Sequence, residues 1–265
     1  MDTLVHTVRI GEAETDCLRF GNENGEKLVI LPGLALKSVM GFAEGIVSAY
    51  ALLAKDFDVY LFDHIKEEPK GYTIADMAGD TLAAFDALGL AHVHLMGVSM
   101  GGMAAQRIAI DAPERVDSLI LCSTAMNLSH ADREAFANWR TLAEERNPSA
   151  LMEAFGESVY TPSFYAQYKE AIIASGEGAT ERDFENFLIS ADAVGAFDVS
   201  DEIQKIACPV LVMGAAEDCV LGVQASYDLI EALRCAHFIY EGYGHAVYDE
   251  APDFLDHIAA FLKGE

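Results

Sequence analysis

The chain has 265 residues, of which 52% are hydrophobic, so it can bury a large core but is too short to favour two independent domains. Its 43 acidic against 17 basic residues give a formal net charge of −26, which argues against binding nucleic acids or anionic membranes, because both require clustered Lys and Arg. We expect this acidity to form a solvated surface rather than to steer cationic substrates.

The first ten residues contain neither the basic nor the apolar region of a secretory signal, and no apolar run reaches the length needed to cross a bilayer. These features predict a cytoplasmic protein without a membrane association. The five cysteines include no C-x-x-C pair, so the sequence indicates neither a disulfide framework nor a zinc site.

Short apolar runs alternate with helical patterns through most of the chain. The first two runs read as an antiparallel hairpin, and the later ones are near-continuous apolar stretches, as in strands that are covered on both faces. Helical patterns cover 74–88, which Gly89 closes, and 102–112. We predict an α/β fold with a mostly parallel eight-stranded sheet flanked by helices. Its strands are 7–10, 15–20, 27–31, 58–62, 92–96, 118–122, 210–213 and 236–240.

The strand and helix rhythm stops between residues 125 and 203. This stretch has only helical patterns, interrupted by Asn147-Pro148 and Thr161-Pro162. We predict a helical cap, inserted into a core made of 1–124 and 204–265, that closes over an active site. A separate second domain is the alternative, but the stretch is small for one.

The most informative motif is Gly97-Val-Ser99-Met-Gly101, placed between a strand and a helix. Such a nucleophile elbow turns so sharply that glycine is needed on both sides of the serine, and it exposes the hydroxyl at the end of the sheet. The backbone N–H of Met100 then lies at a helix N-terminus, where it can stabilise an oxyanion.

A serine nucleophile needs a histidine base that a carboxylate orients, in the chain order serine, acid, histidine. His245 follows the last predicted strand in a glycine-flanked loop, at the edge where ligands bind in open α/β sheets. Glu217 and Asp218 both follow the preceding strand, and adjacent residues point in different directions. We favour Asp218, because its shorter side chain suits a rigid orienting group, and leave Glu217 as the alternative.

An oxyanion hole needs a second backbone donor. Gly33, after the strand 27–31, would let the chain turn so that the N–H of Leu34 faces Ser99, opposite the N–H of Met100. An ordinary turn that ends a strand is the alternative. We predict no cofactor and no bound metal.

These motifs together resemble the α/β-hydrolase superfamily over essentially the whole chain. The resemblance implies the same fold, a serine nucleophile and a helical cap, whereas relatives with an aspartate nucleophile are disfavoured by Ser99. Members commonly have His where Pro32 stands, so a side chain that supports the oxyanion loop is missing here. The matching pieces are LPG at 31–33, FD at 62–63, GVSMGG at 97–102, APERV at 112–116, GAAED at 214–218, GYGH at 242–245 and EAP at 250–252.

The resemblance implies a carboxylesterase-like serine hydrolase that cleaves a small carboxylic ester or lactone through an acyl-enzyme. One alternative uses the same triad to break a carbon–carbon bond or to form peracids. Another belongs to a different class, namely a ligand receptor that retains the triad. We expect a small-molecule substrate, and the sequence leaves its identity and the formation of homo-oligomers open.

Overall fold

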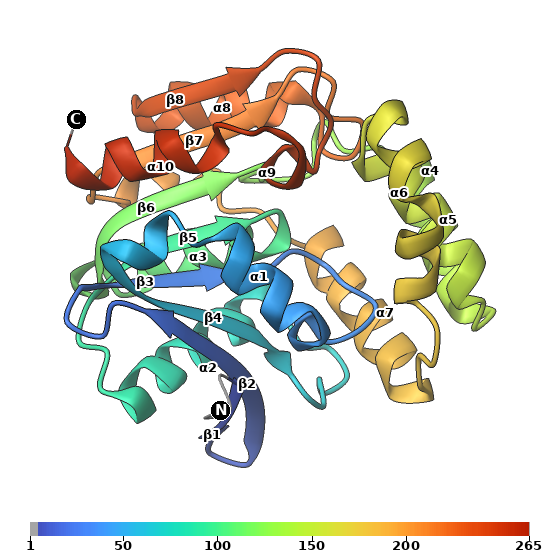
Figure 1. The fold of residues 1–265 in the computed structure, drawn as a ribbon, viewed down its shortest axis with the longest axis horizontal. Helices are drawn as coiled ribbons and strands as arrows, with labels where there is room; N and C mark the ends of the chain where they lie inside the picture. Colours follow the sequence, from blue (N-terminus) through green and yellow to red (C-terminus); the bar gives the residue numbers. More distant parts are fainter. Residues whose placement is uncertain (1–4, 265) are drawn as a thin grey trace.

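An eight-stranded sheet forms the centre of the molecule in residues 5–264, the part of the chain that this computed structural model describes (Figure 1). The strand order is β1-β2-β4-β3-β5-β6-β7-β8, with β1 and β2 antiparallel to their neighbours and the other strands parallel. The predicted fold class is therefore confirmed. The strands are β1 (Val5–Ile10), β2 (Ala13–Gly21), β3 (Glu26–Leu31), β4 (Phe57–Ile65), β5 (Val93–Val98), β6 (Val116–Cys122), β7 (Val210–Ala215) and β8 (Ala236–Tyr240).

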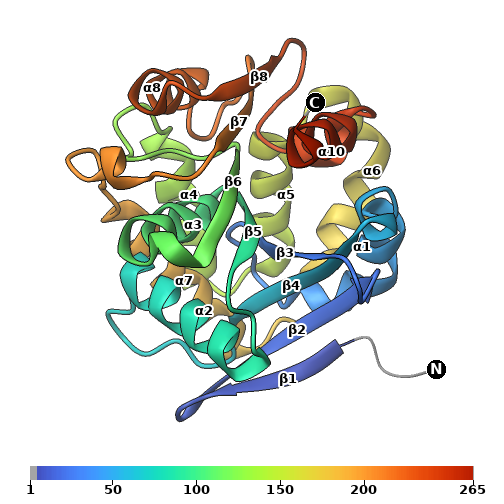
Figure 2. The same ribbon diagram turned by 90° about the vertical axis from the view of Figure 1, so that its left-hand side faces the viewer.

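Helices cover both faces of the sheet (Figure 2). One face packs against α2 (Ile74–Leu88), α3 (Met100–Asp111) and α8 (Val223–Leu233), and the other against α1 (Ala43–Ala49) and α10 (Phe254–Lys263). Successive residues of β3 alternate between the two apolar cores, because side chains along a strand point to opposite faces. The inner strands are therefore apolar on both sides, as their sequences predict.

Local capping explains why α2 has the bounds that the sequence predicts. Thr73 and Asp76 form a capping box at its start, which satisfies backbone N–H groups that the helix itself cannot pair. Gly89 ends the helix with a positive φ of 70°, a conformation that glycine adopts without strain.

Four helices separate β6 from β7 and lie beyond the carboxyl ends of the parallel strands (Figure 1). Each begins at a residue whose side chain accepts a backbone hydrogen bond, namely Asp132, Asn147, Thr161 or Thr180. Pro148 and Pro162 in the sequence are thus helix starts rather than interruptions. The helices are α4 (Arg133–Glu144), α5 (Pro148–Val159), α6 (Pro162–Ser175) and α7 (Glu181–Gly195).

All four helices fall within 125–203, whereas the division into core and cap remains a prediction. Residues 1–4 and 265, which the prediction assigns to the core, lie outside the described residues. Within residues 5–264, no helix is both long enough and apolar enough to cross a membrane.

Polar contacts join these helices to the rest of the molecule on two sides. The hydroxyl of Ser190 on α7 donates to the carboxylate of Glu68, which is only 2% exposed, 2.8 Å away. Burial raises the pKa of Glu68, although the charge of His64 and the hydrogen bond from Ser190 oppose this shift. On the other side, the backbone N–H of Thr161 donates to Glu250 of α9 (Val247–Glu250) over 3.0 Å.

Candidate active site

Ser99 occupies the tight turn between β5 and α3. Its φ of 51° and ψ of −118° lie where few non-glycine residues are found, so the fold holds this serine in a strained conformation. A Cβ atom at position 97 would collide with the carbonyl of Gly101, and one at position 101 with the carbonyl of Leu31. The two flanking glycines are therefore sterically required, as expected for this motif.

The structure brings Ser99, His245 and Asp218 into one hydrogen-bonded chain. The Ser99 hydroxyl lies 3.0 Å from Nε2 of His245, and Nδ1 of the same imidazole lies 2.9 Å from Oδ2 of Asp218. His245 is 3% exposed and Asp218 is 9% exposed, so water competes little for these contacts. Three side chains from the ends of separate strands thus meet at one edge of the sheet.

Asp218 is held rigidly as an anion. Its Oδ1 accepts the backbone N–H groups of Val220 at 2.8 Å and Leu221 at 2.9 Å, which leaves Oδ2 for the imidazole. Burial acts to raise the pKa of Asp218, but the charge of His245 and these hydrogen bonds outweigh it and lower the pKa overall. The carboxylate is therefore ionised and oriented at neutral pH.

Glu217 does not contact the imidazole. Its side chain points instead to the loop after β8, where Oε2 accepts the backbone N–H of Gly242 at 2.7 Å. The backbone N–H of Glu217 also donates to the carbonyl of Tyr243 over 3.1 Å. Glu217 thus fastens the loop that carries His245, a role that we did not expect from the sequence.

The loop after β3 approaches the nucleophile closely. A Cβ atom at Gly33 would lie 3.2 Å from Cβ of Ser99, so a larger residue here would press on the serine. Gly33 and Leu34 line the same cavity as Ser99, His245 and Met100. The two predicted oxyanion-hole residues, Leu34 and Met100, are therefore both neighbours of the candidate nucleophile.

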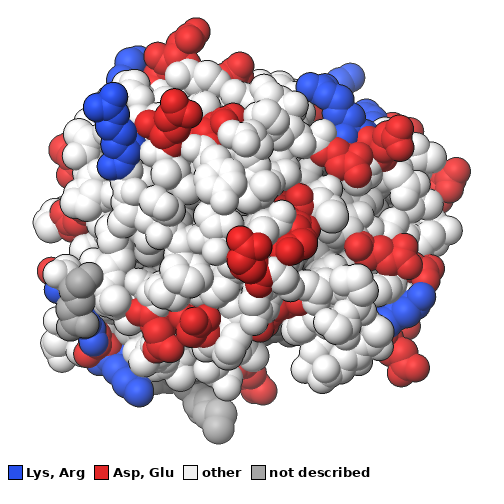
Figure 3. Space-filling view, turned by 90° about the horizontal axis from the view of Figure 1, so that it is seen from above, with Lys and Arg blue, Asp and Glu red and all other residues white. Residues whose placement is uncertain are grey.

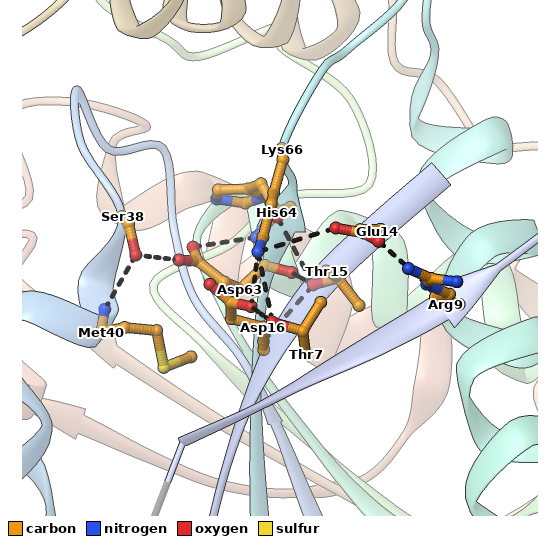
Figure 4. Close-up of polar contacts among 10 residues, drawn as sticks. All are labelled: Thr7, Arg9, Glu14, Thr15, Asp16, Ser38, Met40, Asp63, His64 and Lys66. Atoms are coloured by element: carbon orange, nitrogen blue, oxygen red, sulfur yellow. Dashed lines mark hydrogen bonds and ion pairs between the residues drawn. The ribbon is translucent and has the colours of Figure 1, made fainter. Parts of the chain in front are cut away.

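His64, for which the sequence suggests no role, supports this loop. It lies near the end of β4, where Nε2 donates to the carbonyl of Gly33 over 3.1 Å. The preceding Asp63 accepts the backbone N–H of His64 at 2.9 Å and the hydroxyl of Ser38 (Figure 4). The only available signal was its place at the end of a strand that pairs with β3. The loop after β3 is therefore supported by His64 from the neighbouring strand, because Pro32 stands where many family members have a histidine.

The cavity at Ser99 is small and mostly apolar. Its volume is about 30 Å³, and its walls include Phe136, Trp139, Phe155, Val159 and Val194 from the helices that follow β6. Trp139 is 2% exposed, and its Nε1 has no hydrogen-bond partner among the described residues. The cavity therefore combines apolar walls with one unpaired donor on a residue that lines it.

Metal-binding geometry is not found in the described part of the chain. No group of three or more His, Cys, Asp or Glu side chains in residues 5–264 is arranged to hold a metal ion.

The fold and the site together define the class of protein. Residues 27–252 match the model of the alpha/beta hydrolase fold family, so the chain belongs to this family and is an α/β-fold hydrolase. Two curated relatives are similar to this chain in sequence, at modest identity.

One relative, named putative carbamate hydrolase RutD, from Pseudomonas savastanoi pv. phaseolicola, is 28% identical over 78% of this chain and 86% of its own length. Another, named 3-oxoadipate enol-lactonase 2, from Acinetobacter baylyi, is 27% identical over 72% of each chain.

Solved structures show the same fold over nearly the full length. The enol-lactonase from Burkholderia xenovorans LB400 superposes with a TM-score of 0.84 at 22% identity, covering 97% of this chain and 100% of that one. A thermophilic esterase from Thermogutta terrifontis gives a TM-score of 0.81 at 20% identity, covering 99% of each chain. At such identities these structures support the architecture rather than a substrate.

Proposed function

We propose that the chain is a serine hydrolase that cleaves a small carboxylic ester or lactone through an acyl-enzyme intermediate. The observation that carries this proposal is the unbroken chain of contacts from Asp218 through His245 to Ser99, with distances of 2.9 and 3.0 Å. The curated relative named as an enol-lactonase supports the choice of an acyl–oxygen bond as the one cleaved.

In the first half of the reaction, Oγ of Ser99 attacks the substrate carbonyl carbon while Nε2 of His245 takes the hydroxyl proton. The resulting oxyanion is stabilised by the backbone N–H groups of Leu34 and Met100, and Asp218 stabilises the imidazolium. Collapse of the tetrahedral intermediate breaks the carbon–oxygen bond. His245 then returns its proton to the leaving alcohol, and the acyl group remains on Ser99.

In the second half, water gives a proton to His245 and its oxygen attacks the acyl carbon. His245 then gives this proton to Oγ of Ser99 as the bond to the acyl carbon breaks, which releases the carboxylic acid and restores the serine hydroxyl. We further propose that residues 125–203 act as a cap, because α4, α5 and α7 supply five apolar residues to the wall around Ser99.

A carbamate would also present a carbonyl to Ser99, and a curated relative is named as a putative carbamate hydrolase. The substrate panel should therefore include esters, lactones and carbamates.

Replacement of Ser99 by Ala is the direct test. We expect kcat/KM for p-nitrophenyl acetate and butyrate to fall by at least about a thousandfold, since the nucleophile is lost while binding remains. Steady-state kinetics and a thermal melt should be measured together. Ser48→Ala, on the exposed face of α1, is the matched control and should retain wild-type activity. Undiminished hydrolysis by a folded Ser99→Ala protein would refute the proposal.

A further inference from the structure

The cavity at Ser99 leaves little room for any part of a substrate beyond its ester group. Its volume of about 30 Å³ corresponds to roughly two water molecules, each of which needs about 10–15 Å³ by this measure. A substrate with a longer chain must place that chain in another space. The described residues form such a space directly beside the site.

A second cavity, of about 110 Å³, shares two walls with the first. Leu34 and Phe155 line both spaces, so these two side chains form the partition between them. We call the second space the outer chamber. It lies between the loop after β3, which contributes Leu36 and Val39, and the helices α5 and α7, which contribute Met152 and Phe187.

The walls of the outer chamber suit a hydrocarbon. Its exposed surface is mainly apolar and no carboxylate lines it. The ammonium group of its one cationic wall residue, Lys37, donates to the backbone carbonyl of Glu177 over 2.7 Å. Phe42, at 59% the most exposed of the large apolar side chains in the described residues, also lines the chamber and gives it an apolar rim.

One side chain of the partition is not fully enclosed. Phe155 is only partly buried, and its ring centroid lies 4.7 Å from that of Trp139. Met152 on the outer wall is unbranched and adapts to ligands of different shape. Because Phe155 lines both cavities, a change of its rotamer is the movement that would join them.

We propose that the outer chamber binds an unbranched apolar chain of the substrate, which passes between Leu34 and Phe155 while its ester carbonyl lies at Ser99. This inference rests on the proposed hydrolase function and adds a substrate class to it. An apolar cavity of about 150 Å³ holds a benzene ring, so 110 Å³ accommodates about four chain carbons.

The first test compares chain lengths in two series of esters. p-Nitrophenyl acyl esters from acetate to decanoate vary the acid, and alkyl acetates from ethyl to decyl vary the alcohol. In the series whose chain enters the chamber, kcat/KM should rise about fourfold for each added methylene, then level off when the chamber is full. The other series should stay flat, which shows which end of the ester the chamber receives.

Filling the chamber from two of its lining residues tests its location. Val39→Phe and Ser175→Phe each add a ring inside the chamber without touching the cavity at Ser99. Both variants should turn over acetate esters within about twofold of wild type and lose the gain for longer chains. Ser48→Phe places the same ring on the exposed face of α1 and is the matched control. Phe155→Ala, which removes the partition, should raise the ratio of long-chain to short-chain activity.

A binding measurement keeps the inference testable without turnover. In the Ser99→Ala protein, titration calorimetry should show 1-alkanols binding about fourfold more tightly per added carbon, over about four carbons. Val39→Phe in the same background should abolish this gain. The proposal would be overturned if kcat/KM did not change with chain length in either ester series and alkanol affinity did not change with chain length in the calorimetry. Failure of the serine-hydrolase proposal would give a different result, because ester hydrolysis would then be independent of Ser99 at every chain length.

Discussion

Two adjacent acidic residues serve different parts of the site. Asp218 turns inward and meets the imidazole of His245, whereas Glu217 turns outward and holds the N–H of Gly242. Their side chains diverge in the turn that follows β7, and each reaches a different partner. One acid therefore orients the base, and the other orders the loop on which that base sits.

His64 acts at the residue scale through the backbone of Gly33. Replacing it with Ala should lower kcat by about tenfold or more, because the loop that presents Leu34 loses its support, while KM changes less. His64→Gln, whose amide can donate to the same carbonyl, should restore much of the activity. Steady-state kinetics on a short ester, with a thermal melt for each variant, separates a loss of activity from a loss of stability. Equal losses for Ala and Gln would argue against this role.

At the scale of elements, one buried carboxylate ties three strands together. Asp58 on β4 is fully buried and receives Arg19 of β2 at 2.9 Å and Lys27 of β3 at 2.7 Å. Burial alone would raise the pKa of Asp58, but the hydrogen bonds from Arg19 and Lys27 lower it overall. The joining of β2, β4 and β3 near the start of β4 thus depends on an ionised side chain.

Asp58→Asn should destabilise the protein by about 3 kcal/mol at pH 7, because two cations lose their buried partner. The folded-state pKa of Asp58 lies below its unfolded value, so its contribution is complete above about pH 4 and disappears as the pH falls through the folded value. Urea unfolding of both proteins between pH 7 and pH 3 checks this. The difference in unfolding free energy should shrink on acidification, and a constant difference would contradict the assignment.

The contacts between α4–α7 and the rest of the molecule were less predictable than the helices themselves. Helix starts follow from Asp132, Asn147, Thr161 and Thr180, since capping is a local interaction. The contact between Glu68 and Ser190 joins residues 122 positions apart, and no sequence pattern in either segment predicts it. Such contacts arise only when the chain has folded.

At the scale of the whole molecule, acidic side chains dominate the surface. Figure 3 shows Asp and Glu scattered over one face, with Lys and Arg confined to a few places near its margins. A net charge of −26 makes the compact state repel itself, and this repulsion is screened when the Debye length falls to about 10 Å at 0.1 M salt.

We therefore expect the Tm at pH 7 to rise as NaCl is raised from about 0.01 M to about 0.5 M, since the ions screen repulsion over distances beyond the Debye length. Differential scanning calorimetry checks this. A double variant, Glu157→Gln and Glu170→Gln, removes two exposed charges from α5 and α6 and should show a smaller rise. A Tm that falls with salt would show that ion pairs outweigh repulsion.

Much of the fold was predictable from local patterns. The apolar runs identified the strands because an inner strand is covered on both faces, and Gly97, Ser99 and Gly101 identified the turn because its steric demands are local. The same reasoning placed Asp218 and His245 after successive strands, whose carboxyl ends lie at one edge of a parallel sheet. These inferences need only short stretches of sequence and the geometry of the sheet.

What the amino-acid order determined by itself is therefore the class of fold and the residue types gathered at one edge of the sheet. Tertiary structure alone decided that Glu217 holds Gly242, that His64 supports Gly33, and that Leu34 and Phe155 separate two cavities. The physical reason is the separation along the chain between the residues that interact. Turns, caps and strand patterns depend on near neighbours, whereas side-chain direction and cavity shape depend on packing between segments that are distant along the chain.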